Sequence, residues 1–367
     1  MRPNCEPTHL TLKFIVKLSC KRLDLRLAHT WSIARSRGAD KTSVVIVQLT
    51  DVDGVVGLGE AAPVARYGES AESVEAFCKR VDARKLSFND VTSGMNYLGA
   101  HSPGDMSAKC ALNIALLDGA ARRARKSIHN FLKLGFRENH HVTSFTIGID
   151  RAEVIRKKVL EARRFPILKV KVGAADDAAN LRALREVAPD KWLRVDANEG
   201  WQTKEQSLEM IERLAQDKFI QFIEQPMPAA TPVKDWTWLK QRSPLPIFAD
   251  ESYHHAADAE RCAECFHGVN VKLVKTGGIS AAFDALQAAR KVGLKTMVGC
   301  MIESSVLISA AAHLAELCDY LDVDGNLLIT NDPYRGVTAE NGILSFADTP
   351  EKFGLRVTAR EARSAIN

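Results

Sequence analysis

Four short segments decide the fold: L-K-V-K-V-G at 168–173, R-V-D-A-N at 194–198, F-I-E-Q-P at 222–226 and F-A-D-E-S at 248–252. Each is an apolar run that ends in charged residues, which is typical of a buried strand that reaches a polar surface. The last three segments place Asp196, Glu224 and Asp250 at the ends of successive strands. These residues are 28 and 26 positions apart, about one strand-loop-helix-loop unit each.

The charged residues at these strand ends predict a metal site beside a base. Three carboxylates at the same end of consecutive strands suit a hard, oxygen-preferring cation such as Mg²⁺, with Mn²⁺ as the alternative. Within 169–171, strand alternation puts the ammonium groups of Lys169 and Lys171 on one side. Nearby positive charge lowers an ammonium pKa, as a base requires. A single such motif would indicate a solvated strand face, but all of them in order and at near-constant spacing favour a functional site.

Composition excludes several classes of function. The 367 residues are 46% hydrophobic and 26% charged, as in ordinary globular proteins, and the net charge is only +5. No Lys/Arg block with interleaved aromatic residues indicates nucleic-acid binding, and no apolar run approaches the roughly 20 residues of a membrane span. The eight cysteines are scattered, and the C-x-x-C at 262–265 has no second pair to complete a zinc site. We therefore expect a cytoplasmic protein with reduced cysteines and with neither a nucleic-acid nor a membrane partner.

The order of predicted elements divides the chain into three parts. Residues 1–135 predict an α+β domain, with antiparallel strands over about 8–60, clearest at 10–19 and 42–51, and helices at 70–82 and 106–125. Residues 136–345 alternate strand and helix, which predicts a barrel of eight β/α units with its catalytic groups at the carboxyl ends of the strands. The expected strands are 142–149, 167–172, 192–196, 219–224, 246–250, 269–274, 294–299 and 319–323. The tail, 346–367, is expected to return to the first domain as a strand.

A third lysine is expected on the far side of this barrel. Lys272 falls in the sixth predicted strand, and the second and sixth strands of an eight-stranded barrel lie opposite each other. Lys171 and Lys272 would therefore flank a molecule bound at the metal. This geometry suits removal of a proton from one face of a carbon and its return to the other. Lys275, three positions further on, fits a surface residue.

Together, K-V-K, V-D-A-N, E-Q-P, A-D-E-S and N-V-K-L resemble the enolase superfamily, in its muconate-lactonizing branch. The resemblance covers nearly the whole chain and implies a modified (β/α)8 TIM barrel with an N-terminal α+β capping domain. It also implies one Mg²⁺ per subunit, which binds a substrate carboxylate and stabilises the enediolate formed by loss of the α-proton. The implied roles are metal ligation by Asp196, Glu224 and Asp250, acid/base catalysis by Lys171 and Lys272, electrostatic support by Lys169, and support of the metal site by Asn198 and Glu251.

The substrate is indicated by a second acidic motif. Asp322 and Asp324 form a D-x-D at the end of the eighth predicted strand, and alternation points both carboxylates to the barrel mouth. This motif resembles the signature with which dipeptide epimerases hold the free ammonium group of their substrate. We therefore expect a Mg²⁺-dependent dipeptide epimerase that acts on L-Ala-D/L-Glu-type dipeptides from murein. Homo-oligomers are common in this family, and we expect one here.

The side chain of the second substrate residue is expected to meet Arg35 and Ile302. Arg35 stands where relatives that act on L-Ala-D/L-Glu carry an arginine for the glutamate carboxylate, and Arg suits bidentate pairing. A solvated loop arginine is the competing interpretation, and His29, Arg37 and Arg66 lie nearby in sequence. Ile302 occupies a position where relatives with cationic substrates carry an acidic residue, so its apolar side chain favours Ala-Glu.

Two alternatives remain open at this level. The chain could be another enzyme of the same branch: a cycloisomerase, an o-succinylbenzoate synthase or an N-acylamino acid racemase. Activity on substrates without a free ammonium group would favour this interpretation. The other alternative is a non-catalytic dipeptide-binding barrel, which would bind dipeptides without exchanging the α-proton. The complete Lys/Asp/Glu/Asp/Lys set argues against the latter, since a binding barrel has no need of lysines on both sides.

Overall fold

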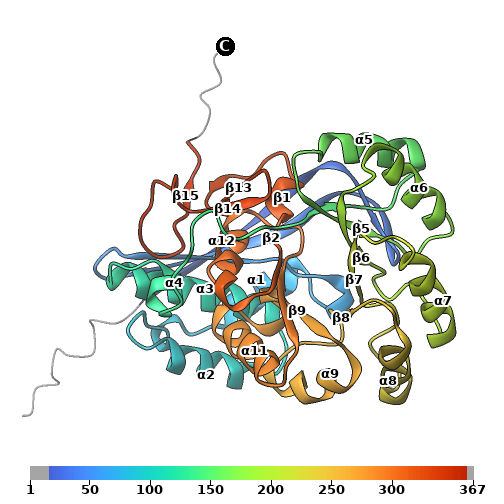
Figure 1. Cartoon of the computed structure of the whole chain (residues 1–367). Helices are drawn as coiled ribbons and strands as arrows, with labels where there is room; N and C mark the ends of the chain where they lie inside the picture. The colour runs from blue at the N-terminus through green and yellow to red at the C-terminus, as the bar shows by residue number, and fades with distance from the viewer. Residues whose placement is uncertain (1–15, 362–367) are drawn as a thin grey trace, which may run out of the picture.

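A barrel of eight parallel strands forms the centre of the protein, which a computed structural model describes over residues 16–361 (Figure 1). Neighbouring strands pair in chain order, and a parallel bridge between Thr143 and Leu321 joins the last strand to the segment before the first. The eight predicted strands are therefore confirmed, with ends shifted by up to three residues. They are β4 (Phe145–Ile147), β5 (Ile167–Lys171), β6 (Trp192–Asp196), β7 (Ile220–Glu224), β8 (Ile247–Ala249), β9 (Gly268–Lys272), β10 (Lys295–Gly299) and β11 (Tyr320–Asp322).

Helices cover the outside of the barrel, which buries the strands on both faces and explains their continuous apolar runs. Seven of the eight strands are followed by α-helical segments. They are α5 (Ala152–Glu161), α6 (Asp177–Val187), α7 (Lys204–Leu214), α8 (Val233–Arg242), α9 (Ala259–Cys265), α10 (Leu273–Thr276) with α11 (Ile279–Lys291), and α12 (Ser305–Ala312). Within residues 16–361, none of the helices combines the length and hydrophobicity that a membrane span requires.

The eighth unit is where this barrel is modified. After β11 the chain forms only a single 3-10 turn, Gly325–Leu327, and then runs beside the capping domain. There the backbone N–H of Ala28 donates to Leu328 O, and the N–H of Thr330 donates to Arg26 O. The backbone after β11 is thus paired with a strand of the capping domain, which replaces the eighth helix.

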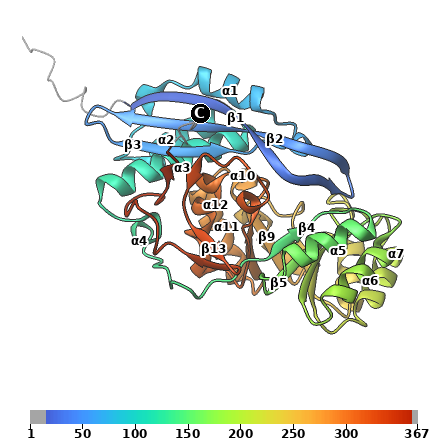
Figure 2. The same cartoon turned by 90° about the horizontal axis from the view of Figure 1, so that it is seen from above.

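The capping domain is a three-stranded antiparallel sheet, β1 (Val16–Ile33), β2 (Ser36–Asp51) and β3 (Val56–Ala61), packed on α1 (Ala71–Arg80), α2 (Val91–His101) and α3 (Met106–Arg123). The sequence indicated strands over about 8–60 without a separate element for 23–40, and β1 and β2 continue through that stretch as one long hairpin. Strand residues 10–15 of the prediction lie outside the described part. Figure 2 shows the hairpin running along the barrel towards α5. Its tip is anchored there because the N–H of Ile149 donates to Ser32 O.

The C-terminal segment contacts the capping domain without joining its sheet. Its strand β15 (Thr358–Ala359) pairs with β12 (Tyr334–Arg335), beside the hairpin β13 (Thr338–Glu340) and β14 (Ile343–Ser345). The tail thus returns to the first domain as predicted, but its strand pairs with β12 and not with the capping sheet. A side chain makes the connection instead, because Asp118 of α3 accepts the N–H groups of both Leu58 and Leu355. The short α4 (Ile128–Phe131) precedes the barrel, and the N–H of Ile128 donates to Gly354 O.

Candidate active site

Three carboxylates meet at the carboxyl ends of β6, β7 and β8. Asp196, Glu224 and Asp250 each offer an oxygen, all within 4.8 Å of one another, and all three residues are buried. An all-oxygen ligand set of this kind suits Mg²⁺. Oε2 of Glu224 accepts no hydrogen bond of good geometry within the described residues, although the Lys169 ammonium lies 2.8 Å away. A buried carboxylate oxygen left in this way fits a metal ligand, so the residues present fit the ion.

Lysines compensate the charge of these carboxylates. Nζ of Lys169 lies 3.0 Å from Asp196 Oδ2 and 2.8 Å from Glu224 Oε2. Burial disfavours the charged form of Lys169, but the surrounding carboxylates raise its pKa well above the usual value. Burial and the charge of Asp196 raise the pKa of Glu224 to about 8. Lys169 is therefore held as a cation among the metal-site carboxylates, where it can give electrostatic support.

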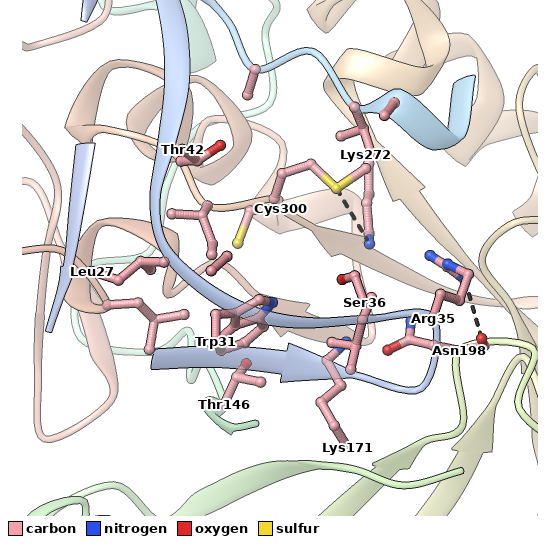
Figure 3. Close-up of a pocket in the computed structure, with 18 of the residues that line it drawn as sticks. Leu27, Trp31, Arg35, Ser36, Thr42, Thr146, Lys171, Asn198, Lys272 and Cys300 are labelled. Carbon is pink, nitrogen blue, oxygen red and sulfur yellow. Dashed lines mark hydrogen bonds between the residues drawn. The ribbon is translucent and has the colours of Figure 1, made fainter. Parts of the chain in front are cut away.

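Lys171 and Lys272 enter the site from opposite walls. They end β5 and β9, which stand four strands apart in the eight-stranded barrel. Figure 3 shows the two side chains pointing toward one another across the cavity. Nζ of Lys171 lies 2.6 Å from Asp196 Oδ2, and Nζ of Lys272 lies 2.8 Å from Asp250 Oδ2. Each ammonium group is thus positioned by a carboxylate of the metal cluster and can act on one face of a bound molecule.

The two carboxylates of the D-x-D motif have different surroundings. Asp322 accepts the Ser144 hydroxyl at 2.7 Å and the Lys169 ammonium at 2.8 Å. Burial alone would raise the pKa of Asp322, but Lys169 lowers it below its usual range. Asp324 accepts the N–H of Thr146 at 2.6 Å, and burial beside Asp322 raises its pKa to about 7. Of the two carboxylates, Asp324 is therefore the one that would gain from a further cationic partner.

Arg35 lies at the tip of the β1–β2 hairpin and faces the cavity, but protein groups already engage it. Its Nη1 donates to Glu251 at 2.5 Å and to Glu199 at 3.0 Å. It also donates to the carbonyl of Asn198 at 3.1 Å (Figure 3). Arg66 also reaches Glu199, and His29 pairs with Glu161 on α5 rather than with the site. The side chain of Arg37 lies outside the described part.

The predicted site residues outside the metal cluster line one cavity of about 310 Å³. The sequence-predicted residues that line it are Arg35, Lys169, Lys171, Asn198, Glu251, Lys272, Ile302, Asp322 and Asp324. The three carboxylates of the metal cluster contact Lys169, Lys171 and Lys272 of this set. Trp31 and Met301 add apolar surface to the wall. The cavity therefore offers lysines on two sides, acidic groups on a third and an apolar region for a side chain.

Sequence reasoning missed three residues of the site. Lys275, interpreted as a surface residue, is buried, and its Nζ lies 2.6 Å from Asp250 Oδ1. The strand ends at Lys272 and one helical turn follows, which brings Lys275 back to the strand end. The carboxylate of Glu199 accepts hydrogen bonds from Arg35 and Arg66 of the capping domain. Tyr67 lines the cavity from a turn of the same domain. Only the run of polar residues after Asp196 pointed towards Glu199; nothing in the sequence singled out Tyr67.

The chain matches two known family profiles. Residues 22–133 match the profile of the mandelate racemase / muconate lactonizing enzyme N-terminal domain, and residues 151–357 match the enolase C-terminal domain-like profile. A protein of Pedosphaera parvula named L-Ala-D/L-amino acid epimerase is 69% identical over 339 residues, which is 92% of this chain and 98% of that protein.

Two further relatives bear on the chemistry. The L-Ala-D/L-Glu epimerase of Bacteroides thetaiotaomicron is 38% identical, over 91% of this chain and 86% of that protein. The crystal structure of a dipeptide epimerase from Enterococcus faecalis V583, complexed with Mg and the dipeptide L-Leu-L-Tyr, superposes with a TM-score of 0.85. That protein is 29% identical and matches 94% of this chain and 99% of its own.

Proposed function

This chain belongs to the mandelate racemase / muconate lactonizing enzyme family of the enolase superfamily, and on that premise we propose that it is a Mg²⁺-dependent dipeptide epimerase. The proposed reaction inverts the α-carbon of the C-terminal residue in L-Ala-D/L-Glu-type dipeptides. The observation that carries the proposal is the pair of opposed lysines, Lys171 and Lys272, above three clustered carboxylates. The 69% identity to an L-Ala-D/L-amino acid epimerase supports the same reaction.

In the proposed mechanism one lysine removes the α-proton and the other delivers a proton to the opposite face. Mg²⁺ held by Asp196, Glu224 and Asp250 would supply positive charge to the substrate carboxylate, which makes the adjacent α-proton more acidic. Lys169 adds a fixed cation beside the same group, because three carboxylates keep it charged. The α-carbon must lie between the two lysine Nζ atoms, so either lysine can act as the base, depending on which diastereomer is bound.

The acidic pair fixes the orientation of the substrate. Asp322 and Asp324 line the cavity at the end of β11, and a dipeptide ammonium group would add the cation that Asp324 lacks. The side chain of the second residue would then face Arg35 and Ile302. Asn198 and Glu251 would support the metal site from the loops that follow β6 and β8.

Other members of this family remain the second candidate, because the same lysines and carboxylates serve a cycloisomerase, an o-succinylbenzoate synthase or an N-acylamino acid racemase. The acidic pair disfavours them, since their substrates bring no ammonium group. For the epimerase we propose a cytoplasmic homo-oligomer that processes murein-derived dipeptides. A reducing compartment agrees with the cysteines of residues 16–361, none of which forms a disulfide.

A dipeptide library incubated in D₂O with Mg²⁺ tests the proposal. Mass spectrometry would report deuterium at each α-carbon, and EDTA-treated enzyme would serve as the control. We expect uptake at the C-terminal residue of L-Ala-L-Glu and related dipeptides, and loss of uptake with EDTA. Uptake only in substrates that lack a free ammonium group would support the second candidate, and tight binding without any uptake would support a non-catalytic barrel.

A further inference from the structure

Four charged side chains form a continuous chain of ion pairs where the capping domain meets the barrel. Glu199, in the loop after β6, accepts Nη1 of Arg35 at 3.0 Å and both Nε and Nη2 of Arg66, at 3.1 and 3.0 Å. It also accepts the N–H of Ala229 at 2.8 Å. Glu251 accepts Nη1 of Arg35 at 2.5 Å. The network thus joins the hairpin tip, a second capping loop and two barrel loops.

The charges of this network cancel. Its two carboxylate side chains are nearly inaccessible, 7% exposed for Glu199 and 1% for Glu251, whereas the Arg35 side chain is 29% exposed and lines the cavity. Two buried anions therefore face Arg35 from the protein side. The negative charges of these two carboxylates largely offset the positive charge that Arg35 presents to the cavity. Because the carboxylates are shielded from water, salt weakens this effect little.

The backbone supports Glu199 in this position. Asn198 and Glu199 both have positive φ angles, 44° and 65°, which are unusual for residues other than glycine. Such consecutive left-handed residues persist only where surrounding contacts hold them. The contacts of Glu199 with two arginines and one backbone N–H provide that hold, so its carboxylate has a fixed place beside Arg35.

We infer that Glu199 sets the substrate class of the proposed epimerase by neutralising Arg35, so that the cavity takes dipeptides with a neutral second residue as well as those with glutamate. The inference rests on the proposed function. Were Arg35 unpaired, a neutral second side chain would leave a desolvated cation without a partner, and glutamate would be strongly preferred. With Glu199 and Glu251 in place, Arg35 needs no substrate carboxylate, and apolar side chains can contact Trp31, Met301 and Ile302.

Two variants change the network in opposite directions. Glu199→Gln removes one anion and leaves Arg35 with net positive charge, whereas Arg66→Met removes one cation and leaves Glu199 in excess. The measurement is kcat/KM for L-Ala-L-Glu divided by kcat/KM for L-Ala-L-Met, with thermal melting to verify folding. In the wild-type enzyme we expect the two kcat/KM values to lie within about tenfold of each other. In Glu199→Gln the ratio should rise by about tenfold, mainly because KM for L-Ala-L-Glu falls. In Arg66→Met the ratio should fall. Glu199→Asp, which keeps the charge, should restore the wild-type ratio.

A structural role alone would change both substrates equally, so equal losses in Glu199→Gln would overturn the inference. A wild-type enzyme more than about a hundredfold selective for L-Ala-L-Glu would also overturn it. If Glu199→Gln does not fold, Arg66→Met decides, because an unchanged ratio there contradicts the charge argument. Failure of the proposed function is distinguishable, since it requires that wild-type enzyme exchange no α-proton in either dipeptide.

Discussion

The ammonium nitrogen of Lys169 lies 2.8 Å from a carboxylate oxygen of Asp322, which joins a residue of the second barrel strand to one of the eighth. The same ammonium contacts Asp196 and Glu224 of the metal cluster. Asp322 is therefore part of the charge balance around the metal site. Asp324, two residues later, has no lysine or arginine partner within the described residues and borders the cavity. The two acids of one motif thus have separate tasks.

Asn substitutions at the two positions should have different kinetic effects. Asp324→Asn removes the anion that faces the substrate ammonium group, so we expect KM for L-Ala-L-Glu to rise about tenfold or more with a smaller change in kcat. Asp322→Asn also disturbs Lys169, so we expect kcat to fall as well. Steady-state kinetics on both variants would separate the effects. Equal changes in kcat and KM for the two variants would contradict this division.

Metal binding should stabilise the folded protein, because three buried carboxylates converge within 4.8 Å and a divalent cation bound there reduces their mutual repulsion. At a Mg²⁺ concentration 100 times its Kd, the free energy of unfolding should rise by about 2.7 kcal/mol. Thermal melting with and without Mg²⁺ would measure the effect independently of activity. Asp250→Asn should lose the Mg²⁺-dependent shift, whereas Asp235→Asn, a substitution on α8 away from the cluster, should retain it. A full shift in Asp250→Asn would place the ion elsewhere.

A buried histidine pair should make the fold sensitive to acid. Nδ1 of His129 lies 2.8 Å from Nδ1 of His313, and Nε2 of His313 donates to Leu355 O at 3.1 Å. Nδ1 of neutral His313 therefore accepts a hydrogen bond from the Nδ1–H of His129. Burial, with the charge of Arg356, lowers the pKa of His129 to about 4, and burial lowers that of His313 well below its usual value.

The sign of this pH dependence follows from linkage. Unfolded histidines take up protons below about pH 6.5 while the folded pair resists, so stability is complete above that pH and is lost as pH falls towards 4. Urea unfolding at several pH values would measure the slope. His129→Asn, whose amide can still donate to His313, should weaken the slope, and replacement of the exposed His140 by Asn should not. An unchanged slope in His129→Asn would show that other groups govern acid unfolding.

The barrel and its charged strand ends were predictable because each strand carries its own local signature. Lys171, Asp196 and Glu224 each directly end an apolar run, and parallel strands bring such ends to one face. The long hairpin was not predictable in the same way. Much of β1 is exposed, so its alternation of apolar and polar residues is weak and charged side chains hid the strand.

The contacts between the capping domain and the barrel could not be predicted from the sequence, for a different reason. Glu199 meets Arg35 and Arg66, which precede it by 164 and 133 positions, and no local pattern reports such long-range pairs. The position of Arg35 in the sequence marked it as a site residue. Its ion pairs with Glu199 and Glu251 depend on how the hairpin tip packs against the barrel, which the sequence does not report. Strand periodicity misled in the case of Lys275, because the chain changes from strand to helix just before it.

The most direct test of the account is α-proton exchange in D₂O by Lys171→Ala and Lys272→Ala, each given L-Ala-L-Glu and L-Ala-D-Glu separately. Two opposed bases predict that both variants lose epimerisation, and that each retains exchange, if any, with only one diastereomer, the opposite one in the two variants. Wild-type turnover in either variant, or equal exchange of both diastereomers by one variant, would contradict the assignment of Lys171 and Lys272 as the two acid/base catalysts.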